Sequence, residues 1–180
     1  VDAAWAAHYG FHPELPEHPL AEGADIVVTS AHKTLPAWSQ ASFVLVREGL
    51  VDLKRFNKAF DSTQTTSMSG RILASMDASR ALLQLHGHEL IDPIIDATEK
   101  GRATLVANGI DVIDGEYIDP LKLVILLPKT GADGNLVEKD LLDANIDVEM
   151  ANRDLIIPMI TFADTPDLIE DLIQRIIDSM

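Results

Sequence analysis

A short buried strand that leads into a lysine constrains this chain more than any other feature. Residues 24–28 form an apolar, β-branched run that is too short for a helix and follows Gly23. A serine, a histidine and then Lys33 come after this run. A lysine held at the end of a strand can be desolvated and lose its proton, and its amine can then attack a carbonyl to form a Schiff base. Alone the pattern is weak, because most such polar clusters are ordinary loop surface.

The beginning of the chain supplies an acid that suits this lysine. Asp2 follows what we interpret as the last residue of another strand, and Lys33 lies 31 positions further on. That separation leaves room for one loop and one strand. Pyridoxal phosphate requires a lysine for its imine, an acid that keeps its ring nitrogen protonated, and hydroxyl and cationic donors for its phosphate. The two residues therefore suggest a site for this cofactor.

Five segments of the chain resemble one enzyme family. Residues 2–13, 23–37, 39–42, 73–80 and 143–151 are similar to the bacterial ornithine/lysine/arginine decarboxylases. The Ser-x-His-Lys stretch and the Gln-Ala-Ser that follows it are specific to this resemblance, which covers nearly the whole chain. It implies a fold-type-I enzyme that depends on pyridoxal phosphate and removes CO2 from a basic amino acid, giving a polyamine precursor.

The resemblance also implies roles for individual residues. Asp2 would pair with the ring nitrogen, Ala4 would pack against one face of the ring, and Trp5 would shape the pocket. Lys33 would form the Schiff base and help in later proton transfer. The cofactor phosphate would be held by a hydroxyl and an imidazole N–H, which come from Ser30 and His32. Among residues further along, Glu149 matches a position near the active site, although a structural role is equally expected. No metal site is expected.

The implied architecture is α/β. Residues 1–78 are expected to form the C-terminal part of an aspartate-aminotransferase-like large domain, and residues 79–180 a linking helix and a small α+β C-terminal domain. No Met precedes Val1. The family's phosphate-binding turn and its ring-stacking residue lie upstream of the matched region, so we expect a C-terminal fragment that is inactive alone.

Two other functions stay open at this point. The chain can be a non-catalytic remnant that serves as an interaction or dimerisation module. It can also belong to another fold-type-I enzyme such as an aminotransferase, because a fold does not determine a reaction. Analysis of the products separates the two chemistries, since one releases CO2 and the other forms a keto acid.

The middle of the chain alternates between predicted helices and loops. A second strand is expected at 41–46, and an amphipathic helix with one apolar and one basic face at 49–61. A hydroxyl-rich loop at 61–70 lacks the Pro and Tyr that the family carries there, which puts its role in doubt. From residue 72 to about residue 108 the pattern is helical, with a break expected near Gly87 and Pro93.

The last third of the chain is predicted to contain elements in the order β-α-β-β-α. A strand at 121–127 precedes a helix that Asn135 would cap. Short strands follow near Val148 and over 155–162, where Pro158 suggests an edge strand or a bulge. Thr165 and the proline after it predict the start of a final helix. Its expected core residues are Leu168, Ile169, Leu172, Ile173, Ile176 and Ile177.

Residues 6–22 form a predicted loop rich in proline and histidine. His8, His12 and His18 share no helix face, and no carboxylate pattern completes a set of metal ligands. We therefore expect these histidines to be exposed on the surface of the loop.

The amino-acid composition of the chain argues against several classes of binding partner. The net charge of −15 argues against general binding to nucleic acid or to anionic membranes. The chain has no Cys, so neither a disulfide framework nor a thiolate metal site is expected. No apolar run approaches the roughly 20 residues of a membrane span. A cytoplasmic location is the default expectation, and the family resemblance implies a homodimer or larger assembly.

Overall fold

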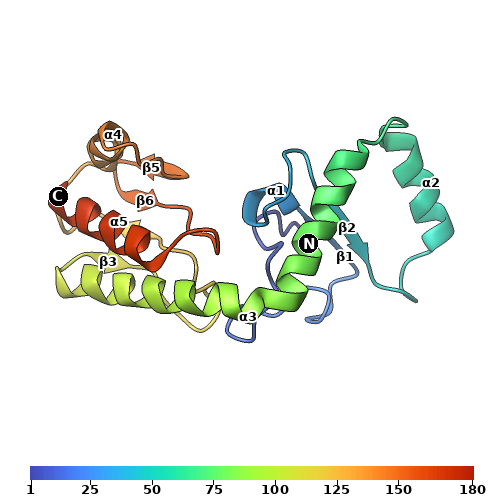
Figure 1. Ribbon diagram of the computed structural model, residues 1–180, viewed down its shortest axis with the longest axis horizontal. Coiled ribbons are helices and arrows are strands. Elements are labelled where there is room, and N and C mark those ends of the chain that lie inside the picture. Colours follow the sequence, from blue (N-terminus) through green and yellow to red (C-terminus); the bar gives the residue numbers. More distant parts are fainter. The chain divides into compact units, whose positions relative to one another are not determined.

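The first residues of the chain pair in parallel with β1 (Ile26–Thr29), and this pairing organises the N-terminal unit. The structure, a computed structural model, describes residues 1–180 and divides into two compact units, 1–87 and 88–180 (Figure 1). The predicted domain division after residue 78 stays a prediction. β1 also pairs antiparallel with β2 (Phe43–Val46), with Val27 opposite Leu45. Val27 is fully buried whereas Val28 is 43% exposed, as expected for a strand with one covered face.

Two helices follow the strands of this unit. The single turn α1 (Ala31–Thr34) comes directly after β1, and α2 (Leu53–Thr63) comes after β2. The Asp52 side chain caps α2 by accepting hydrogen bonds from the backbone N–H groups of Lys54 and Arg55. The amphipathic helix predicted at 49–61 is confirmed, although it begins at Leu53 and ends at Thr63, and none of its residues is buried.

The long helix α3 (Gly70–Ala107) corrects one expectation, because it runs without a break through both Gly87 and Pro93. Burial of Ile91, Ile94 and Ile95 around the proline offsets its cost of about 3 kcal/mol. The presence of a glycine at position 87 of this helix has a packing reason. A Cβ atom at this position would lie 2.8 Å from the carbonyl oxygen of Phe11, so only glycine lets the N-terminal loop approach the helix this closely.

The C-terminal unit contains an antiparallel four-stranded sheet with the order β3-β4-β6-β5. The strand predicted at 121–127 is shorter than expected, since only Ile125 and Leu126 form β4. Nor is Pro158 in an edge strand: β6 lies inside the sheet and ends one residue before this proline, so no ladder hydrogen bond is lost. The strands are β3 (Asp111–Val112), β4 (Ile125–Leu126), β5 (Met150–Asn152) and β6 (Leu155–Ile157).

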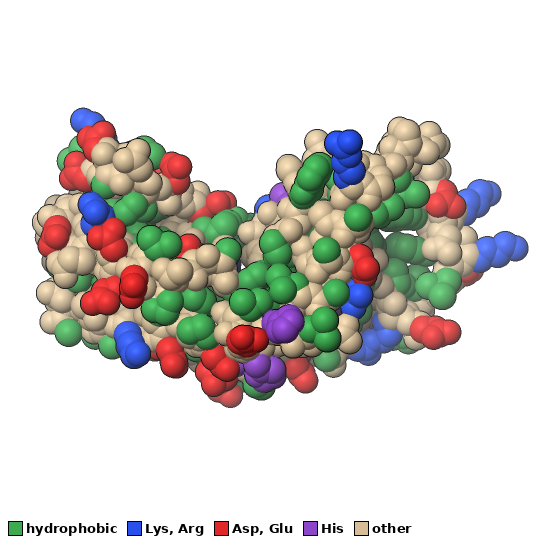
Figure 2. Space-filling view, in the orientation of Figure 1, with side chains coloured by type: hydrophobic (Ala, Val, Ile, Leu, Met, Phe, Trp, Pro, Cys, Tyr) green, Lys and Arg blue, Asp and Glu red, His purple; other side chains and the backbone are tan.

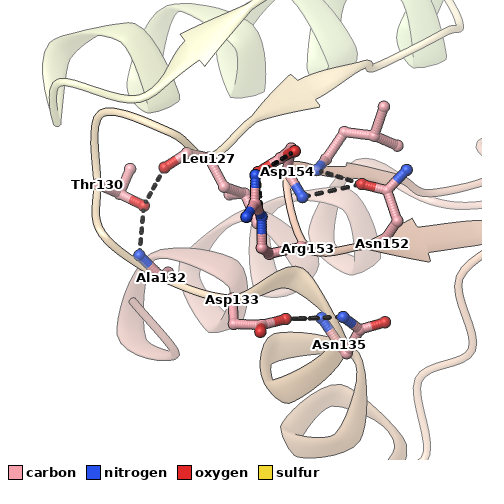
Figure 3. Close-up of polar contacts among 9 residues, drawn as sticks. Leu127, Thr130, Ala132, Asp133, Asn135, Asn152, Arg153 and Asp154 are labelled. Atoms are coloured by element: carbon pink, nitrogen blue, oxygen red, sulfur yellow. Dashed lines mark hydrogen bonds and ion pairs between the residues drawn. The ribbon is translucent and has the colours of Figure 1, made fainter.

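Two helices complete this unit. The cap of α4 (Gly134–Asp143) is Asp133 and not Asn135, because the Asp133 carboxylate accepts the N–H of Asn135 at 2.9 Å (Figure 3). Thr165 caps α5 (Pro166–Asp178) as predicted, and its Oγ1 accepts the N–H of Leu168 at 3.3 Å. Leu168 itself is 58% exposed and does not belong to the core stripe, whereas Ile169, Ile173 and Ile176 are buried.

A tight turn between β5 and β6 packs against the start of α4 (Figure 3). The Asn152 side-chain oxygen accepts the N–H groups of Asp154 at 2.8 Å and Leu155 at 3.1 Å. Arg153 forms a two-point ion pair with Asp154, and its hydrogen bond lowers the pKa of the Asp154 carboxyl. The N–H of Gly134 donates to the carbonyl oxygen of Arg153 at 3.2 Å.

The loop at 6–22 contains neither helix nor strand, as predicted, but two of its histidines are not on the surface. His8 is 2% exposed and His12 is 5% exposed, because the loop folds inward and also buries Ala6, Ala7 and Leu15. None of the helices in the structure, including the 38 residues of α3, is both long and apolar enough to span a membrane.

Candidate active site

A short parallel ladder brings the predicted acid and the predicted lysine to the same edge. The N–H of Val28 donates to Val1 at 3.0 Å, and the N–H of Ala3 donates to Val28 at 2.8 Å. The N–H of Ser30 then donates to Ala4 at 3.2 Å. Because the two segments run in the same direction, the residues that follow each of them emerge at one end. In α/β sheets, ligands bind at this carboxyl end of parallel strands.

Asp2 lies within the ladder and is exposed. Its Oδ1 accepts the N–H of Ala4 at 3.1 Å, which orients the carboxylate and leaves Oδ2 for a ligand. Ala4 is half-buried and has a small side chain, so it can lie flat against a planar ring.

Lys33 and Trp5 meet although they are distant in sequence. The Lys33 Nζ lies 5.1 Å from the centroid of the Trp5 ring, within the range of a cation–π interaction. Lys33 is in the third position of α1, and its backbone N–H donates to Ser30 at 3.2 Å. This one-turn helix therefore directs the lysine toward the residues that follow Asp2.

Ser30 and His32 provide different groups for an anion. Ser30 precedes α1 but its hydroxyl makes no capping bond, so it can donate to a ligand. The His32 Nδ1 lies 2.8 Å from the carbonyl oxygen of Ala41. A carbonyl oxygen can only accept, so Nδ1 carries a proton and Nε2 of the neutral ring is an acceptor. His32 can donate to a phosphate from Nε2 only as an imidazolium.

Two threonines that sequence reasoning did not select also lie in this segment. Thr29 is 2% exposed and Thr34 is 6% exposed, and neither Oγ1 has a hydrogen-bond partner. An unsatisfied buried hydroxyl costs about 1–3 kcal/mol. Strand alternation is the signal that could have found Thr29, since it lies two residues after the buried Val27.

These residues suit pyridoxal phosphate. One edge supplies an oriented carboxylate, a primary amine beside an aromatic ring, and a serine hydroxyl that no protein group uses. The two unsatisfied threonine hydroxyls add polar groups to the same segment. An acid for a ring nitrogen, an amine for an aldehyde and donors for a phosphate are the groups that this cofactor needs.

Glu149 lies in the C-terminal unit and is exposed. Burial lowers the pKa of Lys122 in the same unit, while the charges of Asp119 and Glu149 oppose this shift. Glu149 thus interacts electrostatically with Lys122, and this interaction gives Glu149 a role within its own unit.

Comparison with protein families decides the relationship. Residues 1–115 match the family described as Orn/Lys/Arg decarboxylase, major domain. The chain belongs to this family. An arginine decarboxylase of Bacillus anthracis is 33% identical over an alignment that covers 99% of the chain. The chain spans only 38% of the length of this relative.

Solved structures show the same fold. Lysine decarboxylase A from Pseudomonas aeruginosa superposes with a TM-score of 0.80 at 21% identity, over 98% of this chain and 32% of that protein. SPT with a PLP internal aldimine gives a TM-score of 0.74 at 19% identity, over 99% of this chain and 46% of that one. The predicted α/β fold of fold-type-I enzymes is therefore confirmed.

Proposed function

We propose that this chain provides the lysine-bearing part of a pyridoxal-phosphate-dependent decarboxylase that acts on a basic amino acid. The observation that carries the proposal is the ladder that brings Asp2 and Lys33 to one edge, with the Lys33 Nζ 5.1 Å from the Trp5 ring. The family and its named arginine and lysine decarboxylases support the reaction class. Ornithine, lysine and arginine are the candidate substrates.

Each residue has a defined task. When bound, the cofactor supplies an electron-withdrawing ring that accepts the electron pair left when CO2 departs. Asp2 would hold a proton on the ring nitrogen, and the Lys33 amine would hold the cofactor through its aldehyde. Ala4 would pack against the ring, and Trp5 would shape the pocket and help to exclude water.

The other two residues would hold the phosphate. Ser30 would donate its hydroxyl, and His32 would contact the phosphate through Nε2, because its Nδ1–H is engaged with Ala41.

Two further proposals concern the oligomeric state of the protein and its location in the cell. We expect a bacterial, cytoplasmic homo-oligomer that produces a polyamine precursor, in line with the bacterial relatives. The 180-residue polypeptide alone is expected to show no turnover. The share of its relatives that it spans, 38%, and the exposure of Asp2 support this expectation.

The test is chemical labelling of the lysine. The purified chain is incubated with pyridoxal phosphate and reduced with borohydride, and its intact mass is measured. We expect a single adduct that Lys33→Ala abolishes and Lys139→Ala, an exposed lysine in α4, retains. Label spread over several lysines would contradict the site.

Product analysis tests the reaction in a longer form of the protein. Each basic amino acid is supplied, and released CO2 and keto acid are both measured. CO2 without keto acid supports the decarboxylase, whereas keto acid would favour an aminotransferase. An adduct at Lys33 with neither product would favour a non-catalytic module.

A further inference from the structure

A groove in the C-terminal unit lies between the second half of α3 and the helix α5. Its volume is about 400 Å³, which is within the range of sites that hold small molecules. Three buried residues give it an apolar floor: Ala97, Gly101 and Ile173. Gly101 lets the two helices approach closely, since a Cβ atom there would lie 2.9 Å from Cγ1 of Ile173. The packing of two helices, and not a loop, therefore forms this groove.

The walls of the groove carry three charged groups of both signs. Asp96 and Lys100 lie one turn apart on α3, and Glu170 comes from α5. All three side chains are exposed, and no hydrogen bond or ion pair within the chain engages their charged groups. An acid four residues before a lysine can pair with it on a helix, but these two groups stay apart. The groove thus offers two carboxylates and one ammonium group to a ligand.

This set of charges matches a basic amino acid. Such a molecule carries one carboxylate and two cationic groups on an aliphatic chain, so its charges are the reverse of those on the walls. Lys100 and Asp96 are neighbours, which suits the carboxylate and the ammonium group that share the α-carbon. Glu170, on the other helix, is left for the cation at the end of the ligand's side chain.

The surroundings of the groove also favour a ligand with an excess of positive charge. Asp and Glu side chains are spread over the face of the C-terminal unit that Figure 2 shows, and the whole chain has a net charge of −15. Such a field raises the local concentration of cations. The apolar floor suits the aliphatic part of the same ligand.

We propose that the groove between α3 and α5 binds a free basic amino acid, with Lys100 holding its carboxylate and Asp96 and Glu170 holding its two cations. The charges select this class of ligand, and its identity with the substrate class rests on the proposed function. Because exposed ion pairs are weak, the dissociation constant is on the order of 1 mM. Occupancy would tie α5 to α3 and stabilise the C-terminal unit when the amino acid is abundant.

Nuclear magnetic resonance of the full 180-residue chain, titrated with L-arginine at constant ionic strength, tests the location. The amide signals of Gly101 and Gln174 should shift together and saturate, and Lys33→Ala should leave the titration unchanged. Glu170→Gln should weaken binding at least threefold. Asp167→Asn, an exposed acid of α5 that does not line the groove, should not. No saturable shift at the groove, or equal weakening by both variants, would overturn the proposal.

Two analogues of arginine test which group binds which charge. Citrulline lacks the cation of the side chain and agmatine lacks the carboxylate, so both should bind the wild type several-fold more weakly than arginine. Arginine and citrulline should bind alike to Glu170→Gln, and arginine and agmatine should bind alike to Lys100→Gln. If each variant weakens all three ligands by the same factor, the assigned contacts are wrong.

The groove and the cofactor site can be tested separately. Glu170→Gln should keep the single cofactor adduct at Lys33, because the two residues belong to different units. A labelled Lys33 without binding of arginine in the groove would reject the groove site alone. Binding of arginine in the groove without an adduct at Lys33 would reject the proposed function alone.

Discussion

At the scale of the residue, Arg102 is a charged side chain that is buried and makes several hydrogen bonds. It is 4% exposed, and its guanidinium donates to the carbonyl oxygens of Ile113 at 2.8 Å and Lys122 at 3.1 Å. It also donates to the carbonyl oxygen of Pro120 at 3.5 Å and forms an ion pair with Glu99 at 3.4 Å. Arg102→Ala would leave buried carbonyls unpaired, so we expect a loss of about 3 kcal/mol in the free energy of unfolding.

Urea denaturation measures this loss, with Arg80→Ala as the matched control. Arg80 also bonds to neighbours on α3, but its side chain is 48% exposed, so its removal should cost at most about 0.5 kcal/mol. Equal losses of unfolding free energy in the two variants would show that the buried hydrogen bonds of Arg102 do not stabilise the fold as we infer.

The residue Lys122 gives a prediction of how the stability of the fold depends on pH. Burial lowers its pKa from the ordinary 10.5, against the attraction of Asp119 and Glu149. Between the folded and unfolded pKa values the unfolded chain binds more protons, so this group makes stability rise with pH up to about 10.5. The wild type should therefore gain stability relative to Lys122→Met as the pH approaches that value. Urea midpoints of both proteins across this range measure the difference, and parallel curves would contradict it.

Thr29 links stability to the candidate site. Its buried hydroxyl has no partner, so Thr29→Val should raise the free energy of unfolding by about 1 kcal/mol. Valine has nearly the same shape and favours a strand. Thermal unfolding without cofactor measures the effect, and a destabilised variant would show that the hydroxyl has a partner in solution.

At the scale of the element, the start of α4 depends on glycine. A Cβ atom on Gly134 would overlap the carbonyl oxygen of Asn152 and lie 3.0 Å from that of Leu155. The backbone must move to admit it, so Gly134→Ala should destabilise the C-terminal unit by about 3 kcal/mol. Gly70 is the matched control, since it also begins a helix but has no atom within 4 Å of an added Cβ. Chemical denaturation of both variants tests this, and equal effects would refute the contact.

At the scale of the whole molecule, the net charge of −15 predicts a dependence on salt. Repulsion among carboxylates opposes the compact state, and salt screens it. Raising NaCl from about 10 mM to about 150 mM should raise the Tm by roughly 3 °C. At about pH 4, where many carboxylates are protonated, the effect should shrink. A Tm that falls with salt at neutral pH would mean that attractive ion pairs dominate.

The sequence by itself determined the elements whose causes are local. An apolar β-branched run predicted β1, an apolar stripe predicted α2, and a threonine before a proline predicted the start of α5. The Ser-x-His-Lys stretch, together with the other segments that resemble the decarboxylases, predicted the family that residues 1–115 match. Each of these signals is a short run of neighbouring residues.

Only the tertiary structure decided features that depend on distant partners. The continuity of α3 through Pro93, the burial of His8 and His12, and the cap of α4 on Asp133 all depend on packing or turn geometry that local propensity does not contain. The same holds within the site. Sequence reasoning paired His32 with a phosphate through an imidazole N–H, but a backbone carbonyl nine residues away determines which ring nitrogen carries the proton. Local patterns specify elements, whereas protonation, burial and close approach depend on which atoms the fold brings together.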